Sequence, residues 1–189
     1  MALSALALCT RALLKIGAQP IASLDEGTAE AEVAANLYAG TRDAMLSSHP
    51  WSFATGQSCL PRLAATPVAD FQYAFQLPAG ILRVLSAGLP ESGRGLAYRL
   101  FEDRLHCNAP QVVLSYVFRP DESAFPAFFA AALAARLAAE FCIPLTENTS
   151  RAQLLLAQAE VELGRARRAD SQQATPRAIE DFPLVTVRG

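Results

Sequence analysis

Apolar residues recur at helical spacing in four segments of this chain. The segments cover residues 3–16, 28–48, 125–141 and 151–170. In the third segment an apolar residue returns every four positions, at Phe125, Phe129, Leu133, Leu137 and Phe141. The spacing predicts four α-helices. The wide stripe predicts that the third helix is buried on most sides, either in a bundle core or in a contact between subunits.

Local signals predict where these helices begin and end. Gly17 is suited to cap the end of the first helix, because glycine readily adopts a left-handed conformation. Pro50 stops the second helix, because proline disfavours a helical conformation in the residue before it. Short polar side chains are available as N-terminal caps. The candidates are Asp25 or Thr28 for the second helix and Thr149 or Ser150 for the fourth.

Between the second and third helices the pattern becomes strand-like. Runs such as YAFQL, ILRVLSAGL and VVLSYVFR are rich in Val, Leu, Tyr and Phe, and Pro, Gly, Asn or acidic turns separate them. The run LFEDRLHC predicts a hairpin that turns at Glu102 and Asp103. We expect residues 97–119 to form a three-stranded meander within a small antiparallel β subdomain.

The predicted fold class is α+β, mainly an α-helical bundle of four helices with an inserted small antiparallel β subdomain and an extended C-terminal tail. We assign residues 1–50 and 124–170 to the two halves of the bundle, 51–123 to the β subdomain and 171–189 to the tail. A free tail is normally polar, but this one ends in the apolar run FPLVTV. Phe182, Leu184 and Val185 are therefore expected to dock on a partner or a neighbouring subunit, or alternatively to pack on their own chain.

Composition refines this picture. Hydrophobic residues make up 52% of the chain and charged residues 18%, which favours a sizeable core and surfaces buried by partners. The formal net charge of −2 gives no general attraction to nucleic acid. Of the 16 cationic residues only Lys15 is a lysine; arginine suits interfaces, although a GC-rich genome produces the same bias. Arg136 and Glu140 interrupt the most apolar segment, so we expect no membrane span.

The residues that usually carry chemistry are sparse. His49 and His106 lie in different predicted elements, the four cysteines are scattered without a CxxC pair, and adjacent carboxylates fall in turns. No nucleophile elbow and no phosphate-binding loop is present. We interpret His49 as a helix-terminal residue and Trp51 as packed under the sheet. We therefore expect no enzyme activity, no cofactor and no metal site.

Several segments together resemble one family. They are ALLKIGAQPIASLDEGTAEA, LYAGTRDAMLSSHPWSFAT, YAFQLPAGILRVL and the long run FPAFFAAALAARLAAEFCIPLTENTSRAQLLLAQAEVELGRARRAD, which follow one another between residues 12 and 170. In this combination the chain resembles the head-to-tail adaptors of short-tailed bacteriophages, of the tail tubular protein A type. The fourth helix departs from the family pattern, because LLLAQAEVEL replaces a late aromatic residue.

The resemblance implies a structural virion protein of the neck region, assembled in the host cytoplasm. It implies a homo-oligomeric ring of twelve copies between the portal protein and the tail nozzle protein, with genomic DNA passing through the lumen without specific binding. In that setting Pro50, Trp51 and Phe53 form a fixed junction between the second helix and the β subdomain. The candidate subunit or portal contacts are Arg42, Arg136, Arg165, Arg168, Phe182, Leu184 and Val185.

One alternative from another class stays open. The run GRARRAD near the end of the fourth helix would suit a cytoplasmic, helical nucleic-acid-binding regulatory protein. Glu160, Glu162 and Asp170 surround this run and balance its charge, which favours a solvated or subunit-contacting face. Salt-dependent DNA binding distinguishes this alternative from the adaptor.

Overall fold

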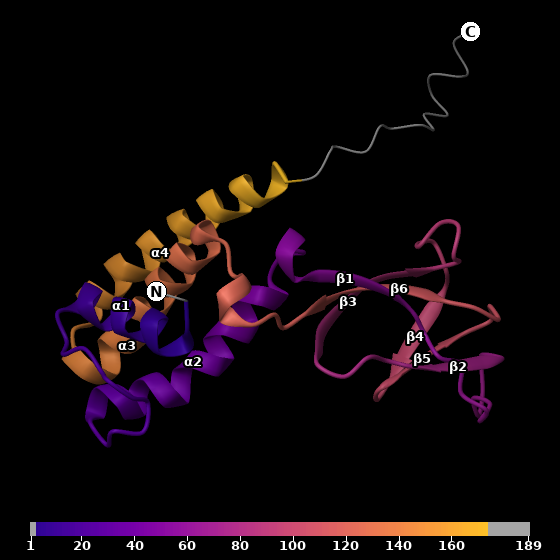
Figure 1. The fold of residues 1–189 in the computed structure, drawn as a ribbon, viewed down its shortest axis with the longest axis horizontal. Helices are drawn as coiled ribbons and strands as arrows, with labels where there is room; N and C mark the ends of the chain where they lie inside the picture. Colours follow the sequence, from indigo (N-terminus) through magenta and orange to yellow (C-terminus); the bar gives the residue numbers. More distant parts are fainter. Residues whose placement is uncertain (1–2, 174–189) are drawn as a thin grey trace, which may run out of the picture.

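The computed structural model describes residues 3–173, which form a mixed α+β fold of helices and two small antiparallel sheets (Figure 1). The helices are α1 (Ala5–Ile16), α2 (Ala29–Ser47), α3 (Ala127–Thr146) and α4 (Thr149–Ser171), with short 3-10 turns η1 (Ser52–Ala54) and η2 (Glu122–Ala124). The strands are β1 (Thr55–Cys59), β2 (Tyr73–Gln76), β3 (Ile81–Gly88), β4 (Tyr98–Phe101), β5 (Arg104–Cys107) and β6 (Val113–Phe118).

The helix ends follow local capping rules. Gly17 adopts a positive φ of 72° after α1, and its backbone N–H bonds back to Leu14, which confirms the predicted C-terminal cap. The Thr28 hydroxyl accepts a hydrogen bond from the Ala31 N–H at the start of α2. The predicted cap of α4 was wrong by one or two residues. The side chain of Asn148 accepts from the Arg151 N–H at 2.9 Å, so Thr149 and Ser150 already lie inside the helix.

Helix α3 is the central element of the helical part. It packs against α1, α2 and α4. The five residues of its predicted stripe are all buried, from Phe125 at 7% exposed to Phe129 at 0%. This stripe therefore lies in the core of its own chain and is not available as a subunit contact. Alanines between the large side chains let the neighbouring helices approach closely, and three alanines of α4, at positions 152, 159 and 166, are buried on the same side.

Among the described helices, α3 is also long and apolar enough to cross a membrane by length and composition, despite Arg136 and Glu140. In the fold, 61% of its most apolar window is buried inside the protein. That environment is typical of the core helix of a packed domain.

The six strands form two sheets, ordered β1-β6-β3 and β2-β5-β4. The hairpin predicted at Glu102 and Asp103 is confirmed, because β4 pairs with β5 and Glu102 takes a positive φ of 54° in the turn. The predicted three-stranded meander is wrong. Strand β2 occupies the other side of β5, and β6 lies at the centre of the other sheet, between β1 and β3. Strand pairing thus joins segments distant in the sequence.

The helices lie at one end of the molecule and the sheets at the other (Figure 1). The chain passes from helices to sheets after α2 and returns between β6 and α3. The sheet end has its own apolar cluster, which includes Phe75, Leu105 and Leu114. The predicted C-terminal tail, with Phe182, Leu184 and Val185, lies outside the described residues except for its first three positions.

Candidate functional site: the joint between helices and sheets

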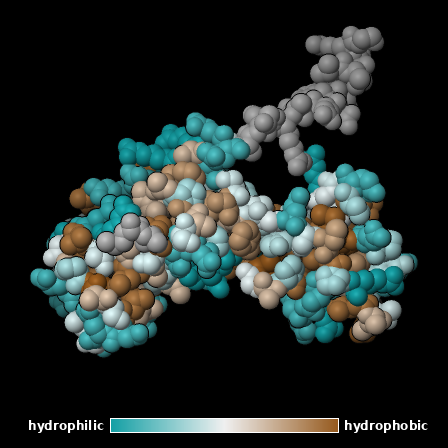
Figure 2. Space-filling model, viewed as in Figure 1, coloured by the Kyte–Doolittle hydropathy of each residue, from teal (hydrophilic) through white to brown (hydrophobic). Residues whose placement is uncertain are grey.

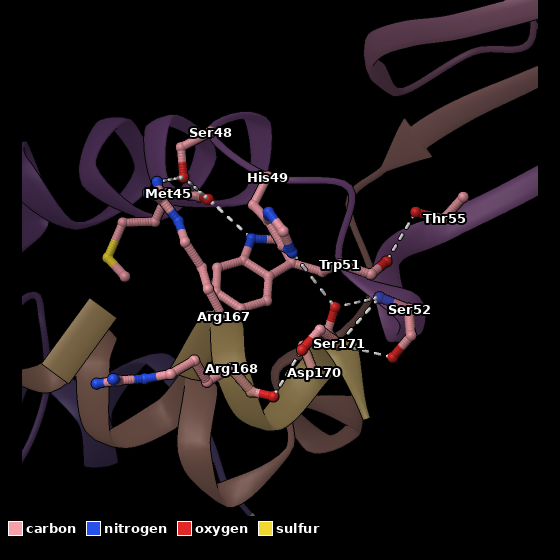
Figure 3. A network of polar contacts seen from close by, with 10 residues as sticks. All are labelled: Met45, Ser48, His49, Trp51, Ser52, Thr55, Arg167, Arg168, Asp170 and Ser171. Carbon is pink, nitrogen blue, oxygen red and sulfur yellow. Dashed lines mark hydrogen bonds and ion pairs between the residues drawn. The ribbon is translucent and has the colours of Figure 1, made fainter. Parts of the chain in front are cut away.

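Trp51 anchors the point where the chain leaves α2. The helix ends at Ser47, and Pro50 stands exposed in the short connection that follows. Trp51 is 0% exposed, and its indole N–H donates to the carbonyl oxygen of Met45 in the last turn of α2 at 3.0 Å (Figure 3). The side chain thus turns back onto the helix that precedes it, which fixes the direction in which the chain continues.

An aromatic cluster surrounds this anchor. The Trp51 ring meets Phe129 of α3 edge to face at a centroid distance of 5.0 Å and stacks on Phe128 at 6.5 Å. Phe53 contacts Phe129 at 5.0 Å and Phe125 at 5.9 Å. The prediction that Trp51 lies under the sheet is wrong. Both Trp51 and Phe53 pack on α3, and Phe53 lies in the 3-10 turn η1, which turns the backbone toward β1.

Asp170, near the end of α4, holds η1 in place. Its carboxylate is 4% exposed and accepts the Ser52 N–H at 3.1 Å and the Ser52 hydroxyl at 2.7 Å (Figure 3). A buried carboxylate is favourable only when such donors replace its water shell. The sequence does not indicate this role, because Asp170 follows the arginines of α4 and fits a charge-balanced, solvated face equally well. The available signal was an acidic residue at a helix C-terminus, where the dipole disfavours it.

His49 lies beside the same carboxylate, with its Nε2 atom 3.6 Å from the Asp170 side chain. Burial lowers the pKa of His49 below its ordinary value of 6.5, and the nearby Asp170 only partly offsets this effect. Arg167 and Arg83 also disfavour the protonated imidazole. The neutral form of His49 is therefore favoured, packed edge to face against Trp51 at 4.8 Å.

Charged side chains of α2 bind the segment through which the chain returns from β6 to α3. Arg42 donates to Glu122 of η2 at 3.1 Å, and the Tyr38 hydroxyl donates to the same carboxylate at 2.9 Å. Three residues earlier in the same connection, Arg119 donates to Asp43 at 3.0 Å. Arg42 and Asp43 thus hold residues 119–122, which lead from β6 into α3.

These contacts set the charge state of the network. Burial raises the pKa of Glu122, but its own backbone N–H, Tyr38 and Arg42 outweigh this effect and leave the pKa below 4.5. Burial likewise raises the pKa of Asp43, while hydrogen bonds from Arg119 and Arg42 bring it below 3.8. Both carboxylates are therefore ionised at neutral pH and act as fixed acceptors.

A further tie comes from the sheet itself. The Arg83 guanidinium, on β3, donates to the backbone carbonyl of Ser47 at 2.7 Å, at the C-terminus of α2. A cation at this position also interacts favourably with the negative end of the helix dipole. The end of α2 therefore contacts the outgoing segment, the returning segment and a neighbouring strand.

The other arginines proposed as contacts lie away from this joint. Arg136 pairs with Glu140 at 2.8 Å and with Glu160 at 3.3 Å, which links α3 to α4. Arg165 pairs with Glu162 at 2.7 Å along the α4 surface, and Arg168 is exposed. Arg42, by contrast, is turned inward to the joint. The structure thus divides the four arginines into one that holds the joint and three on the faces around α4.

The joint does not assemble a Ser-His-Asp triad. His49 and Ser52 both contact Asp170, and the Ser52 hydroxyl donates to the carboxylate at 2.7 Å. In a Ser-His-Asp triad the serine hydroxyl donates to the histidine and the carboxylate holds the histidine from its other side, which is not the arrangement here. Within residues 3–173, no three His, Cys, Asp or Glu side chains are grouped so that they could hold a metal ion. The arrangement is suited to fixing two parts of a protein against each other.

No protein-family model matches this chain, and a search of curated proteins finds no relative.

Proposed function

We propose that this chain is a head-to-tail adaptor of a short-tailed bacteriophage, a structural protein that forms a ring between the portal and the tail nozzle. The observation that carries the proposal is the joint. Both segments that connect helices and sheets are held to the end of α2, through Trp51 and Asp170 on the way out and through Arg42 and Asp43 on the way back. These residues include the motif positions on which the resemblance rests.

A fixed joint is what a ring adaptor requires. Its two ends contact different rings, so each subunit has to present both surfaces at one distance and one angle around the whole circle. A joint that bends independently in each copy would break that symmetry. Here aromatic packing and charged hydrogen bonds at two separate crossings hold the sheet end against the helical end.

In this proposal residues 1–50 and 124–170 form the bundle, 51–123 the β subdomain and 171–189 the tail. The tail, with Phe182, Leu184 and Val185, docks on the portal or on a neighbouring subunit during assembly. Genomic DNA crosses a lumen that does not bind it specifically, in keeping with a formal net charge of −2. The protein resides in the neck of the virion and, before assembly, in the host cytoplasm.

Light scattering of the purified chain, alone and after mixing with the portal protein of the same phage, tests this function. We expect a closed ring on the portal, and a chain that ends at residue 173 should fail to join it. A full-length chain that ignores the portal overturns the proposal. If that chain instead binds DNA with a steep salt dependence, it is a nucleic-acid-binding regulator.

A further inference from the structure

Strand β1 has one edge that no described strand covers. Its other edge pairs with β6 in the sheet β1-β6-β3, so β1 is the first strand of this sheet. Within residues 3–173, no strand and no isolated bridge pairs with the outer edge of β1. Such an edge offers unpaired N–H and C=O groups to any extended segment that can reach it, and proteins usually cover or block these edges.

The register of β1 determines which of its backbone groups point outward. The Leu60 N–H donates to the Val112 carbonyl at 2.9 Å and continues the pairing of β1 with β6. In an antiparallel pair, residues that exchange hydrogen bonds alternate with residues that do not. The even-numbered residues therefore bond to β6. The N–H and C=O groups of Thr55, Gln57 and Cys59 point away from the sheet.

Helix α4 ends beside this open edge. The Asp170 carboxylate accepts the N–H and the hydroxyl of Ser52, three residues before β1 begins. Ser171 lines a cleft of about 640 Å³ together with Thr55 and Gln57. The chain therefore leaves α4 close to the start of β1.

The segment that follows is long enough to reach the whole edge. Residues 174–181 separate the described chain from the apolar run FPLVTV at residues 182–187. At about 3.3 Å per residue, residues 174–181 span up to about 26 Å, whereas the five residues of β1 span about 17 Å. The run can thus enter at the far end of β1 and return along it.

The position of its proline favours one phase of pairing. Phe, Val and Thr are typical of strands. Proline is tolerated in a strand where its missing N–H faces away from the ladder. If the even-numbered residues of the run bond to β1, Pro183 falls on the free side and also keeps a further strand from adding there.

The same phase brings apolar side chains to a place where β1 is small. Residues directly opposite each other in an antiparallel pair share a face. Gly56 lies opposite Tyr116, which packs on the apolar cluster of the sheet end, and Ser58 follows on the same face. These two residues cover little of that cluster, and apolar residues are exposed among hydrophilic ones on the sheet end (Figure 2). In antiparallel pairing, Val185 and Val187 fall on this face.

We propose that residues 182–187 pair with β1 of their own chain and form an antiparallel fourth strand of the sheet β1-β6-β3. Both existing pairs in this sheet are antiparallel, and sheets of one kind are favoured. The pairing itself does not depend on the proposed function. Only its consequence does: a free subunit keeps its apolar tail on β1, and the portal has to compete with β1 for it.

Cys59 allows a direct test on the full-length chain, because it is the exposed cysteine among the four and its backbone faces the open edge. Opposite residues of neighbouring strands have Cα atoms about 5.5 Å apart, within reach of a disulfide. Under mild oxidation, Phe182→Cys or Leu184→Cys should form an intramolecular disulfide with Cys59 at least about tenfold faster than Pro183→Cys and Val185→Cys, whose side chains point to the other face. Peptide mass spectrometry identifies the bond, and Cys59→Ser abolishes it.

Hydrogen exchange tests the pairing without a new thiol. The amides of Gln57 and Cys59 should be protected in the full-length chain. Thr186→Pro removes an N–H that is aimed at β1 and should lower this protection at least about tenfold. Val185→Pro is the matched control, because the N–H that it removes faces outward.

Each outcome decides the pairing. Equal linkage at the four positions, or faster linkage at positions 183 and 185, overturns it, and so does an unprotected edge in the wild-type chain. Disulfides between two chains, in a yield that rises with concentration, show that the edge takes the tail of a second copy. A chain with the expected pattern that ignores the portal keeps the pairing and loses the adaptor function. A chain that joins the portal without this pattern keeps the function and loses the pairing.

Discussion

Replacing Trp51 is the most direct perturbation of the joint. The side chain is fully buried, and its ring contacts His49, Phe128 and Phe129. A buried tryptophan removes about 200 Å² from water, worth about 5 kcal/mol at about 25 cal/mol per Å². Alanine retains a small part of that area, so Trp51→Ala should lower the free energy of unfolding by about 4 kcal/mol, within the range of such truncations.

Trp51→Phe separates packing from the hydrogen bond. Phenylalanine keeps an aromatic ring against Phe129 but cannot donate to the Met45 carbonyl. That carbonyl also accepts the Ser48 hydroxyl at 2.8 Å, so it remains satisfied. The cost should therefore come mainly from the smaller ring and be about 1.5 kcal/mol.

Urea unfolding followed by far-UV circular dichroism measures both variants, because Trp51 is the only tryptophan and its fluorescence is lost in them. Phe101→Ala serves as the control, since Phe101 on the sheet end is 41% exposed, and it should lower stability by less than about 1 kcal/mol. If Trp51→Ala destabilises no more than Phe101→Ala does, the side chain does not anchor the joint. We further expect Trp51→Phe to join the portal and Trp51→Ala to fail.

Three further predictions concern the same joint and its surroundings. Asp170→Ala leaves the Ser52 donors without an acceptor and should lower stability by about 2 kcal/mol in urea unfolding, whereas an unchanged stability would contradict the role of the carboxylate. The pKa values of Asp43 and Glu122 lie below their ordinary values of 3.8 and 4.5, so these groups contribute stability above those values and lose it as the pH falls below them. The temperature of thermal unfolding should therefore decrease in acid. The decrease should be smaller for Asp43→Asn and Glu122→Gln. Of the cysteines, only Cys59 is exposed, so a thiol reagent should modify one thiol per native chain and rapid modification of more than one would indicate that the core opens.

The helix pattern was the most predictable part of the fold, because its signals are local. Gly17, Thr28 and Pro50 act on neighbouring backbone, and each occupies the position expected from the sequence. The burial of Phe129 and Leu133 follows equally from their spacing. The spacing does not tell which structural element covers the apolar stripe. The same stripe fits a bundle core or a subunit contact, and only the packing of α1, α2 and α4 on α3 decides between them.

The strand order was less predictable, because a strand does not specify its neighbour. The hairpin between β4 and β5 has a short turn and was found, but the next strand in sequence crosses to the other sheet. Residues between β5 and β6 include Pro110, which has no N–H to donate to a ladder. Strand β6 instead lies between β1 and β3, with Leu114 and Val117 fully buried.

Asp170 shows why the sequence predicted the position of the joint but not the contacts that hold it. A carboxylate in the last turn of a helix is unfavourable by about 0.3–1 kcal/mol, so local rules alone argue against it. The opposing contribution comes from Ser52, 118 residues away in the chain, which presents its N–H and its hydroxyl because Trp51 has already turned the backbone onto α3. The contact between Asp170 and Ser52 thus depends on the packing of Trp51 against α3. Loss of Trp51 should weaken the Asp170 contact as well, and the two substitutions combined should cost less than the sum of their separate effects.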